Sequence, residues 1–370
     1  MQGSVLTALT RASQFAALLT FLLPTGAAQA ASITDFMVMT VCTDAAGALQ
    51  TAMAPIDPGC RSRRKLLPGE PAPYRLTTFS AANDVCANRQ GVVVRHNMPV
   101  VVNGVTRIVS YDDHIPRSGC RLSGEQLSYG ASIQGTDGLF GFILGDDGPT
   151  GQINFESPPI CRAFPASARR FSRGWVIGPV NLPSPGGSGF VAMPAVLGIG
   201  DPGVVLSRPC PQGGPLALTT WTMDRMIFTG GLTLDALVSD HFSRANLVGT
   251  GPGAAQQMER TYWTTEFGLT RWEKWARADW TGGGTPVPAL GRAAWATPTC
   301  SPPHGMAMTG DQQPGALRTQ GEWSQIMRDA RTGQQFTWFL LDCRDYSNID
   351  RTAQSAPPAV PARYLPWWKG

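Results

Sequence analysis

The stretch ERTYWTTEFGLTRWEKWARADW, residues 259–280, decides how this sequence is interpreted. Its first half is rich in threonine and aromatic residues, which favour β-strands because their side chains pack well on a pleated surface. Side chains alternate along a strand, so Tyr262, Thr264 and Glu266 share one face. Gly268 permits a turn or a bulge, after which residues 269–275 return as the partner strand.

A helix is the alternative for the second half of this stretch. It would place Trp272, Trp275 and Ala276 on one face and pair Glu273 with Arg277 four residues later. We prefer the strand, because the preceding TYWTT run is strongly β in type.

The composition extends this β prediction to the whole chain. Charged residues make up 15% of the 370 residues, below the roughly 25% of an average soluble domain. The 42 glycines and 31 prolines favour many short elements joined by turns. These features exclude a helical bundle, a coiled coil and a charged disordered tail.

Short runs rich in valine, isoleucine, threonine and phenylalanine recur along the chain and predict strands. They are residues 36–41, 74–79, 91–96, 99–110, 139–144, 175–180, 216–221, 225–229, 259–265 and 335–343. The strongest local signal is VVVNGVTRIV, residues 100–109, because Asn103-Gly104 accepts the positive φ angles of a two-residue hairpin turn.

The fold class that follows is mainly β, an antiparallel β-sandwich of jelly-roll-like architecture with two β regions. Two sets of apolar residues follow helical spacing and predict one or two short helices packed on the sheets. They are Leu234, Leu237, Val238 and Phe242, and Trp323, Ile326, Met327 and Ala330.

Residues 1–30 are expected to be a signal peptide. Arg11 supplies a positive start, residues 15–23 are apolar, and residues 28–30 (AQA) have the pattern of a cleavage site. No later run approaches the roughly 20 apolar residues that a transmembrane helix needs. We therefore expect an exported protein, periplasmic or extracellular, with no transmembrane segment in the mature chain.

All eight cysteines follow this leader, and an even number in an oxidising compartment predicts up to four disulfides. No C-x-x-C pair occurs and the four histidines stand far apart, so a structural zinc site is not expected. A division near residues 145–149 leaves four cysteines on each side, and every tryptophan follows it.

The expected organisation has four parts: the signal peptide at 1–30, an N-terminal β region at 31–148, a Trp-rich β-sandwich domain at 149–354 and a Pro-rich tail at 355–370. A single continuous two-sheet domain stays open as the alternative, because all-β domains can exceed 200 residues.

The Trp-rich stretch has the chemistry of a carbohydrate-binding surface. The apolar face of a sugar ring stacks on a flat aromatic side chain, and sugar hydroxyls suit carboxylate and guanidinium partners. We therefore expect a carbohydrate polymer as the partner. The predicted binding residues are Tyr262, Trp263, Arg271, Trp272, Trp275 and Trp280.

The alternative interpretation is an ordinary sheet core. Buried tryptophans would then pack the sandwich, and Glu266 would face Arg271 as a cross-strand ion pair. The protein would in that case be a non-catalytic structural or adhesive protein of the cell envelope, whose aromatic residues form a core or a protein interface.

A glycoside hydrolase needs two carboxyl groups about 5 to 9.5 Å apart, and the candidates are Glu266 with Glu273 or Asp279. On one continuous strand, Glu266 and Glu273 would lie roughly 23 Å apart. The pair therefore works only if Gly268 folds the chain back.

A polysaccharide lyase is the second cleavage chemistry. It would need a cation to neutralise a uronate and a base to remove a proton. Tyr262, Arg271, Lys274 and His241 are residues of the right types. Binding without cleavage is preferred, because no catalytic pair is convincing.

Other function classes have less support. The sequence lacks a G-x-S-x-G elbow, a phosphate-binding loop and a dinucleotide-binding turn, so a serine hydrolase and a nucleotide partner are not expected. The net charge of +4 is too small to require nucleic acid. No cofactor is expected. The carboxylates at residues 111–114 and 146–147 could donate oxygen ligands to calcium, although neither stretch has the sequence pattern of a calcium-binding loop.

Overall fold

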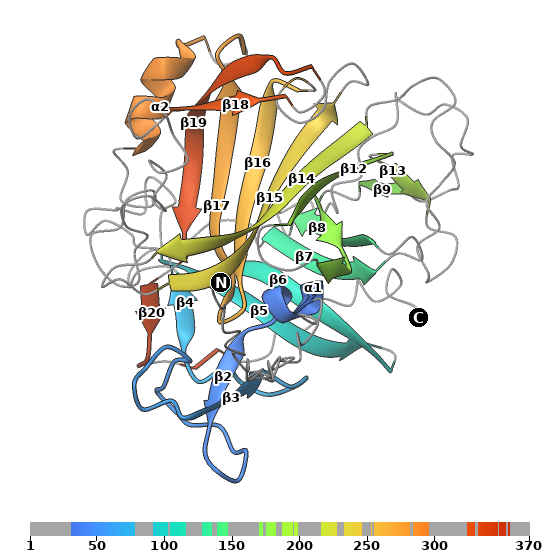
Figure 1. The fold of residues 1–370 in the computed structure, drawn as a ribbon. Coiled ribbons are helices and arrows are strands. Elements are labelled where there is room, and N and C mark those ends of the chain that lie inside the picture. Colours follow the sequence, from blue (N-terminus) through green and yellow to red (C-terminus); the bar gives the residue numbers. More distant parts are fainter. Residues whose placement is uncertain are drawn as a thin grey trace, which may run out of the picture.

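The computed structural model shows a mainly β protein made of antiparallel strands and two short helices among the residues that it describes (Figure 1). The described residues are 31–77, 92–102, 104–115, 128–134, 139–146, 170–172, 175–182, 187–194, 196–198, 216–227, 233–245, 253, 255–281, 284–295, 324–329, 332–346, 348–352 and 354–355. The predicted mainly β, antiparallel class is confirmed.

The first of two large sheets has seven strands in the order β10-β8-β7-β6-β5-β4-β20. Its strands are β4 (Arg75–Thr77), β5 (Val92–Val102), β6 (Val105–Ile115), β7 (Ser128–Gln134), β8 (Leu139–Asp146), β10 (Trp175–Pro179) and β20 (Asn348–Asp350). Five of these strands come from the predicted N-terminal region 31–148, and β10 and β20 join them from the region that follows.

The second large sheet has the order β12-β14-β15-β16-β17-β19-β18. Its strands are β12 (Ser188–Pro194), β14 (Leu216–Ile227), β15 (Thr233–Ala245), β16 (Gln257–Thr264), β17 (Gly268–Arg277), β18 (Ser324–Arg328) and β19 (Gln335–Asp345). Residues 269–275 therefore form a strand, and the helix alternative for them is wrong.

The two helices lie elsewhere than the sequence indicated. Helix α1 (Ile33–Met37) begins at a capping box, in which Ser32 and Asp35 satisfy each other's backbone N–H groups. Helix α2 (Val287–Trp295) lies beside β19, at the top of Figure 1. Within the described residues, neither helix is long and apolar enough to cross a membrane.

Both stretches with apparent helical spacing are strands, so these predictions are wrong. In β15, Leu234, Val238 and Phe242 are separated by four residues each. Four is close to one helical turn and is also an even number, so it places side chains on one face of a helix or of a strand alike. The stretch 323–330 contains the short strand β18, which pairs with β19; Trp323 and Ala330 lie outside the described residues.

The predicted hairpin at residues 100–109 is confirmed by the register of β5 and β6. Val102 pairs directly with Val105, which leaves a two-residue turn, and Gly104 has a φ of +79°. Such a positive φ is what a tight hairpin turn requires.

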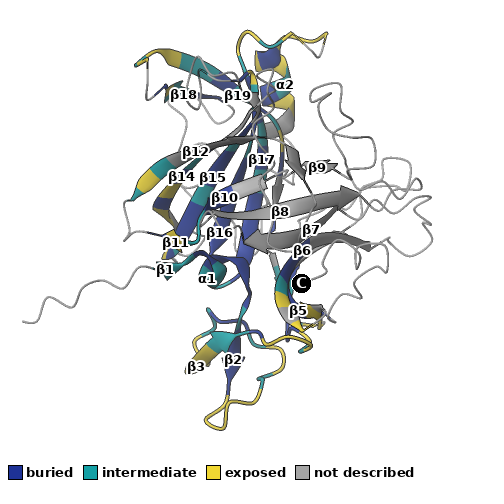
Figure 2. Ribbon diagram, turned by 90° about the vertical axis from the view of Figure 1, so that its right-hand side faces the viewer, coloured by how far each residue is buried: buried dark blue, intermediate teal, exposed yellow. Residues whose placement is uncertain are grey.

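One apolar core joins the two sheets and α1. Its members come from α1, from the first sheet and from the second sheet, and include Phe36, Leu76, Met98, Ile177, Trp221, Leu237, Trp263 and Leu269. Figure 2 shows buried residues concentrated along β15, β16 and β17. A second, separate apolar cluster around Trp275 and Trp338 lies farther along the second sheet.

A small lobe built on β2 (Thr40–Thr43) and β3 (Ser62–Lys65) projects at the bottom of Figure 1. The Cys42–Cys60 disulfide closes it. Cys343 is also disulfide-bonded, so every cysteine in the described part of the chain is oxidised. The remaining two-stranded pairs are β1 (Ala31–Ser32) with β11 (Asn181–Leu182), and β9 (Arg170–Ser172) with β13 (Val196–Gly198).

Candidate functional site

The cross-strand register places the residues of the β16–β17 hairpin on two opposite faces of the second sheet. Residues directly opposite each other on antiparallel strands point to the same side of the sheet. Arg260 lies opposite Glu273, and Tyr262 lies opposite Arg271. These four side chains therefore share one face, which we call the ion-pair face.

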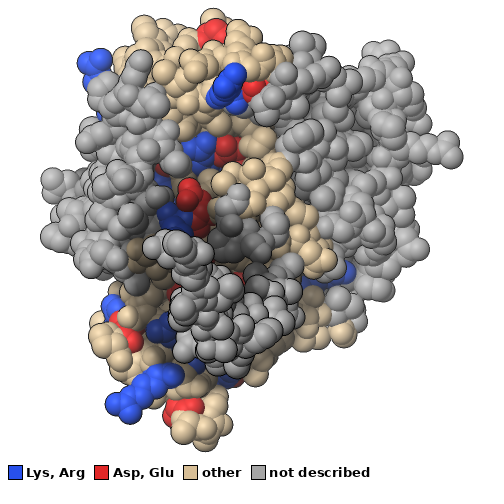
Figure 3. All heavy atoms as spheres, in the orientation of Figure 1, with Lys and Arg blue, Asp and Glu red and all other residues tan. Residues whose placement is uncertain are grey.

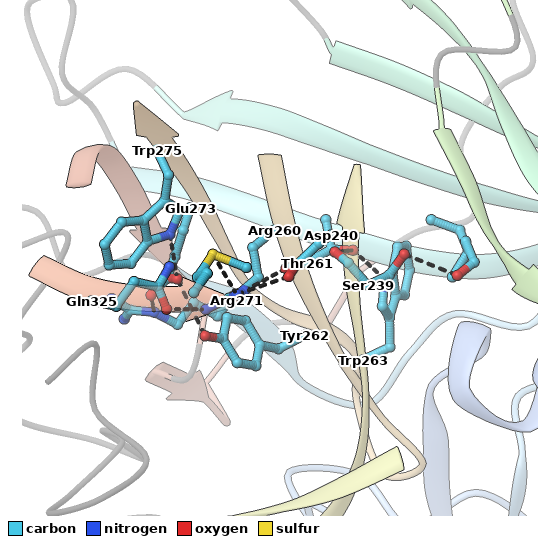
Figure 4. A network of polar contacts seen from close by, with 12 residues as sticks. Ser239, Asp240, Arg260, Thr261, Tyr262, Trp263, Arg271, Glu273, Trp275 and Gln325 are labelled. Atoms are coloured by element: carbon cyan, nitrogen blue, oxygen red, sulfur yellow. Dashed lines mark hydrogen bonds and ion pairs between the residues drawn. The ribbon is translucent and has the colours of Figure 1, made fainter. Parts of the chain in front are cut away.

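The Glu273 carboxylate is the centre of this face (Figure 4). It accepts hydrogen bonds from Arg271 Nε at 2.7 Å, Tyr262 Oη at 3.2 Å and Trp275 Nε1 at 2.9 Å. Glu273 and Arg271 are both fully buried. Because three donors already bind its oxygens, Glu273 is held as a structural anion rather than presented to a substrate.

A second buried ion pair lies beside the first. Arg260 Nε and Nη2 donate to the two carboxylate oxygens of Asp240 at 2.5 and 2.8 Å, and Nη1 donates to Gln325 Oε1 at 3.0 Å. The guanidinium also lies 5.9 Å from the ring centre of Trp275. The two ion pairs thus tie β15, β16, β17 and β18 together through side chains.

The protonation of this cluster suits a structural role. Although burial alone would lower the pKa of Arg260, the neighbouring Asp240 carboxylate raises it above its usual value. Burial and the Glu273 carboxylate raise the pKa of Tyr262. Tyr262 therefore stays protonated as a donor at neutral pH and does not serve as a base.

Most of the predicted binding residues belong to the interior. Four of the six have at most 1% of their surface exposed: Tyr262, Trp263, Arg271 and Trp275. Trp272 and Trp280 are partly exposed. Of the six predicted binding residues, only Trp272 and Trp280 have side chains with appreciable solvent exposure.

Glu266 lies in the turn between β16 and β17, which is docked against the N-terminal part of the chain. Its backbone oxygen accepts a hydrogen bond from Thr40 N at 2.8 Å, and the next carbonyl, of Phe267, accepts one from Asn97 Nδ2 at 3.1 Å. The Glu266 carboxylate accepts a hydrogen bond from Thr265 Oγ1 at 2.9 Å. This turn anchors the hairpin to the first sheet.

The suggested ion pair between Glu266 and Arg271 is wrong. Arg271 lies opposite Tyr262, because residues 265–267 leave the ladder as a turn and the register shifts between Tyr262 and Trp263. Gly268 does fold the chain back, with a φ of +77°.

The three predicted catalytic carboxylates are not brought together. Glu273 lies five residues up β17 from Gly268, roughly 16 Å at about 3.3 Å per residue, whereas Glu266 stays in the turn. Asp279 follows the far end of β17, where Arg277 donates to it at 2.6 and 2.8 Å. These hydrogen bonds lower the pKa of Asp279, so it stays ionised.

The opposite face of the second sheet carries a continuous line of polar residues, one from each of five neighbouring strands. Thr219 of β14 pairs with His241 of β15, His241 with Glu259 of β16, Glu259 with Lys274 of β17, and Lys274 with Asp342 of β19. We call these five residues the cross-strand row. Thr219 is buried, the next three are partly exposed and Asp342 is exposed, so the row opens towards β19.

Trp272 stands next to this row and on the same face. Its Nε1 donates a hydrogen bond to Glu259 Oε2 at 3.2 Å. Towards the turn the same face becomes apolar, with Leu237, Trp263 and Leu269 in the shared core. Trp272 thus lies where the core ends and the polar row begins.

His241 supplies a neutral ring to the row. The side chain keeps some contact with solvent, but its Nδ1 is buried without a hydrogen-bond partner. Burial lowers the pKa of His241 to about 4, so the imidazole is uncharged at neutral pH. An uncharged imidazole offers one donor and one acceptor.

The residue types suggested for a lyase are divided between the two faces. His241 and Lys274 lie in the cross-strand row, whereas Tyr262 and Arg271 lie on the ion-pair face. The sheet itself separates the two pairs, so they cannot act on one sugar residue.

The calcium candidates contribute no described site. Residues 111–114 lie within β6, and Asp146 ends β8, with Asp147 outside the described residues. Among the residues that the structure describes, no group of three His, Cys, Asp or Glu side chains could hold a metal ion.

Sequence reasoning missed the cross-strand row as a unit. The residue types of His241 and Lys274 make them candidates, but no local motif links them to Thr219, Glu259 and Asp342. These residues are close together only because of the register of five strands, and a motif within one segment cannot predict that register.

Compared with protein-family models, with curated proteins and with solved structures, the chain has no match in any of the three comparisons. Its function therefore has to be argued from the arrangement of its own residues.

Proposed function

We propose that this protein is an exported, disulfide-linked β-sandwich protein that binds a polysaccharide along the cross-strand row and does not cleave it. The observation that carries the proposal is the row itself, a line of partly exposed polar side chains bordered by a partly exposed tryptophan. This combination offers a sugar ring both an aromatic surface and hydrogen-bond partners.

The sandwich arrangement is supported by the core. Residues of both large sheets, such as Met98 and Trp263, share one apolar cluster, as expected for two layers packed face to face. Export is supported by the oxidised cysteines, because disulfides such as Cys42–Cys60 persist in oxidising compartments.

Binding without cleavage is supported by the positions of the carboxylates. The predicted pair Glu266 and Glu273 is separated along the hairpin, and Glu273 is enclosed by its own donors. Neither residue can both reach a sugar and act with a second carboxyl group at hydrolase distance.

The test is a titration of the mature chain with a panel of polysaccharides, followed by tryptophan fluorescence. Replacing Trp272 by Phe removes the indole N–H that holds Glu259, so Trp272→Phe should weaken binding by about tenfold, the worth of one hydrogen bond to a charged group. Trp280→Phe is the matched control, because Trp280 is also partly exposed but follows β17 outside the row. Equal affinities for the two variants would refute the assignment of the site.

A structural or adhesive envelope protein is the second candidate. It is favoured by the ion-pair face, where Arg260 pairs with Asp240 and Arg271 pairs with Glu273 inside the protein. A flat response across the whole panel would favour this candidate over carbohydrate binding.

A further inference from the structure

The charges of the cross-strand row alternate along its length. Glu259 and Asp342 are acidic, Lys274 between them is basic, and His241 beside Glu259 is uncharged at neutral pH. The row therefore carries two negative charges and one positive charge.

A polyanion gains little from such a surface. Each carboxylate of an acidic sugar polymer would approach Lys274 but also the carboxylates on either side of it, and opposite and like charges act over the same few ångströms. Among the described residues visible in Figure 3, acidic and basic side chains are likewise interspersed rather than gathered by sign.

Uncharged sugars suit the row better. A hydroxyl group both donates and accepts hydrogen bonds. Along the row, carboxylates that accept alternate with an ammonium group that donates, and the His241 ring does both. A chain of hydroxyl-bearing rings therefore finds a complementary partner at each strand without needing a charge of its own.

We propose that the ligand of this site is an uncharged polysaccharide that lies across the strands, from His241 to Asp342. The inference rests on the proposed function. Neighbouring strands lie about 4.8 Å apart, so the four strands from β15 to β19 provide a contact roughly 14 Å long. The open end at Asp342 allows the polymer to continue beyond the row.

The experiment measures binding of the mature chain to an uncharged glucan, a polyuronate and an amino-sugar polymer at low and high NaCl concentration. We expect the glucan to bind with a dissociation constant that changes less than twofold with salt, because no net charge is neutralised. We expect no saturable binding of the polyuronate.

A charge variant sharpens the test. Asp342→Lys turns the open end of the row basic and should create polyuronate binding that weakens at least fivefold at high salt. Asp224→Lys is the matched control, because Asp224 is exposed on β14 of the same sheet but outside the row, and the variant makes the same change in net charge. Polyuronate binding by both variants would overturn the inference, since it would reflect overall charge.

The outcomes separate the two proposals. Saturable, salt-insensitive glucan binding supports both. Binding of only the polyuronate or the amino-sugar polymer by the unaltered protein overturns the uncharged-ligand inference and leaves polysaccharide binding intact. Binding of no polymer, by a protein whose unfolding transition is normal, overturns the proposed function and the inference together.

Discussion

Gly268 combines a positive φ with close packing, so an added methyl group there should destabilise the fold for two reasons. It has a φ of +77°, and a Cβ built there would lie 2.7 Å from Asn97 Cβ and Cγ and 2.8 Å from Asn97 Nδ2. Alanine at a positive φ costs about 1–2 kcal/mol by itself. The clash adds a second cost, because Asn97 must move.

Moving Asn97 breaks two buried hydrogen bonds. Its Nδ2 donates to Phe267 O at 3.1 Å, and its Oδ1 accepts from Ser110 Oγ at 2.9 Å. The loss of each buried hydrogen bond costs about 1–3 kcal/mol. We therefore expect Gly268→Ala to lower the free energy of unfolding by about 3–8 kcal/mol in total.

Gly104 provides the matched control for this prediction. It has nearly the same φ, +79°, but nothing lies within 4 Å of a Cβ built there. Gly104→Ala should therefore cost only the strain of about 1–2 kcal/mol. Urea unfolding of both variants, monitored by tryptophan fluorescence, measures the difference. If the two variants lose the same stability, the turn does not dock against Asn97 as described.

Three further predictions concern stability. Glu273→Ala should cost about 3–5 kcal/mol, because it removes the buried carboxylate to which Arg271, Tyr262 and Trp275 donate. Asp279→Ala removes the more exposed partner of an ion pair and should cost less than about 1 kcal/mol. Urea unfolding compares the two variants, and equal losses would contradict the buried network. His241 has a folded-state pKa of about 4 against an ordinary 6.5, so the unfolded chain takes up a proton first as the pH falls through this range. Stability should therefore fall between about pH 6.5 and pH 4, and by less in His241→Gln; equal acid sensitivity of the two proteins would refute the burial of the ring. Replacing both Cys42 and Cys60 by serine should cost about 3 kcal/mol, as expected for a loop with a sequence separation of 18, and a thermal unfolding midpoint equal to that of the parent would argue against the bridge.

The local β structure could be predicted because its determinants are local. The TYWTT run, the turn at Gly268 and the Asn103-Gly104 dipeptide each act over a few residues, and the structure places strands and turns there. The helical predictions failed because the even spacing of Leu234 and Val238 fits a strand face as well as a helix face.

The candidate site could not be predicted in the same way. The sequence places Glu259 and Trp272 thirteen residues apart, and only the register of β16 with β17 shows that their side chains meet. The register shift after Tyr262 changes which residues face each other, and no residue type in the segment indicates it. The composition indicated the chemistry of the segment but not the face on which each residue lies.

The buried ion pairs help to fix the register of the strands in the second sheet. A slip of one residue between strands would move every side chain to the other face of the sheet. Such a slip of β16 would turn Arg260 away from Asp240 and bury Glu259 in its place, so two carboxylates would face each other in the interior without a cation. An unpaired buried charge costs several kcal/mol, so the ion-pair face opposes the slipped register more strongly than apolar packing would. The same register aligns His241, Glu259 and Lys274 on the opposite face. The ion pairs that a polymer cannot reach thus position the row that we propose it contacts.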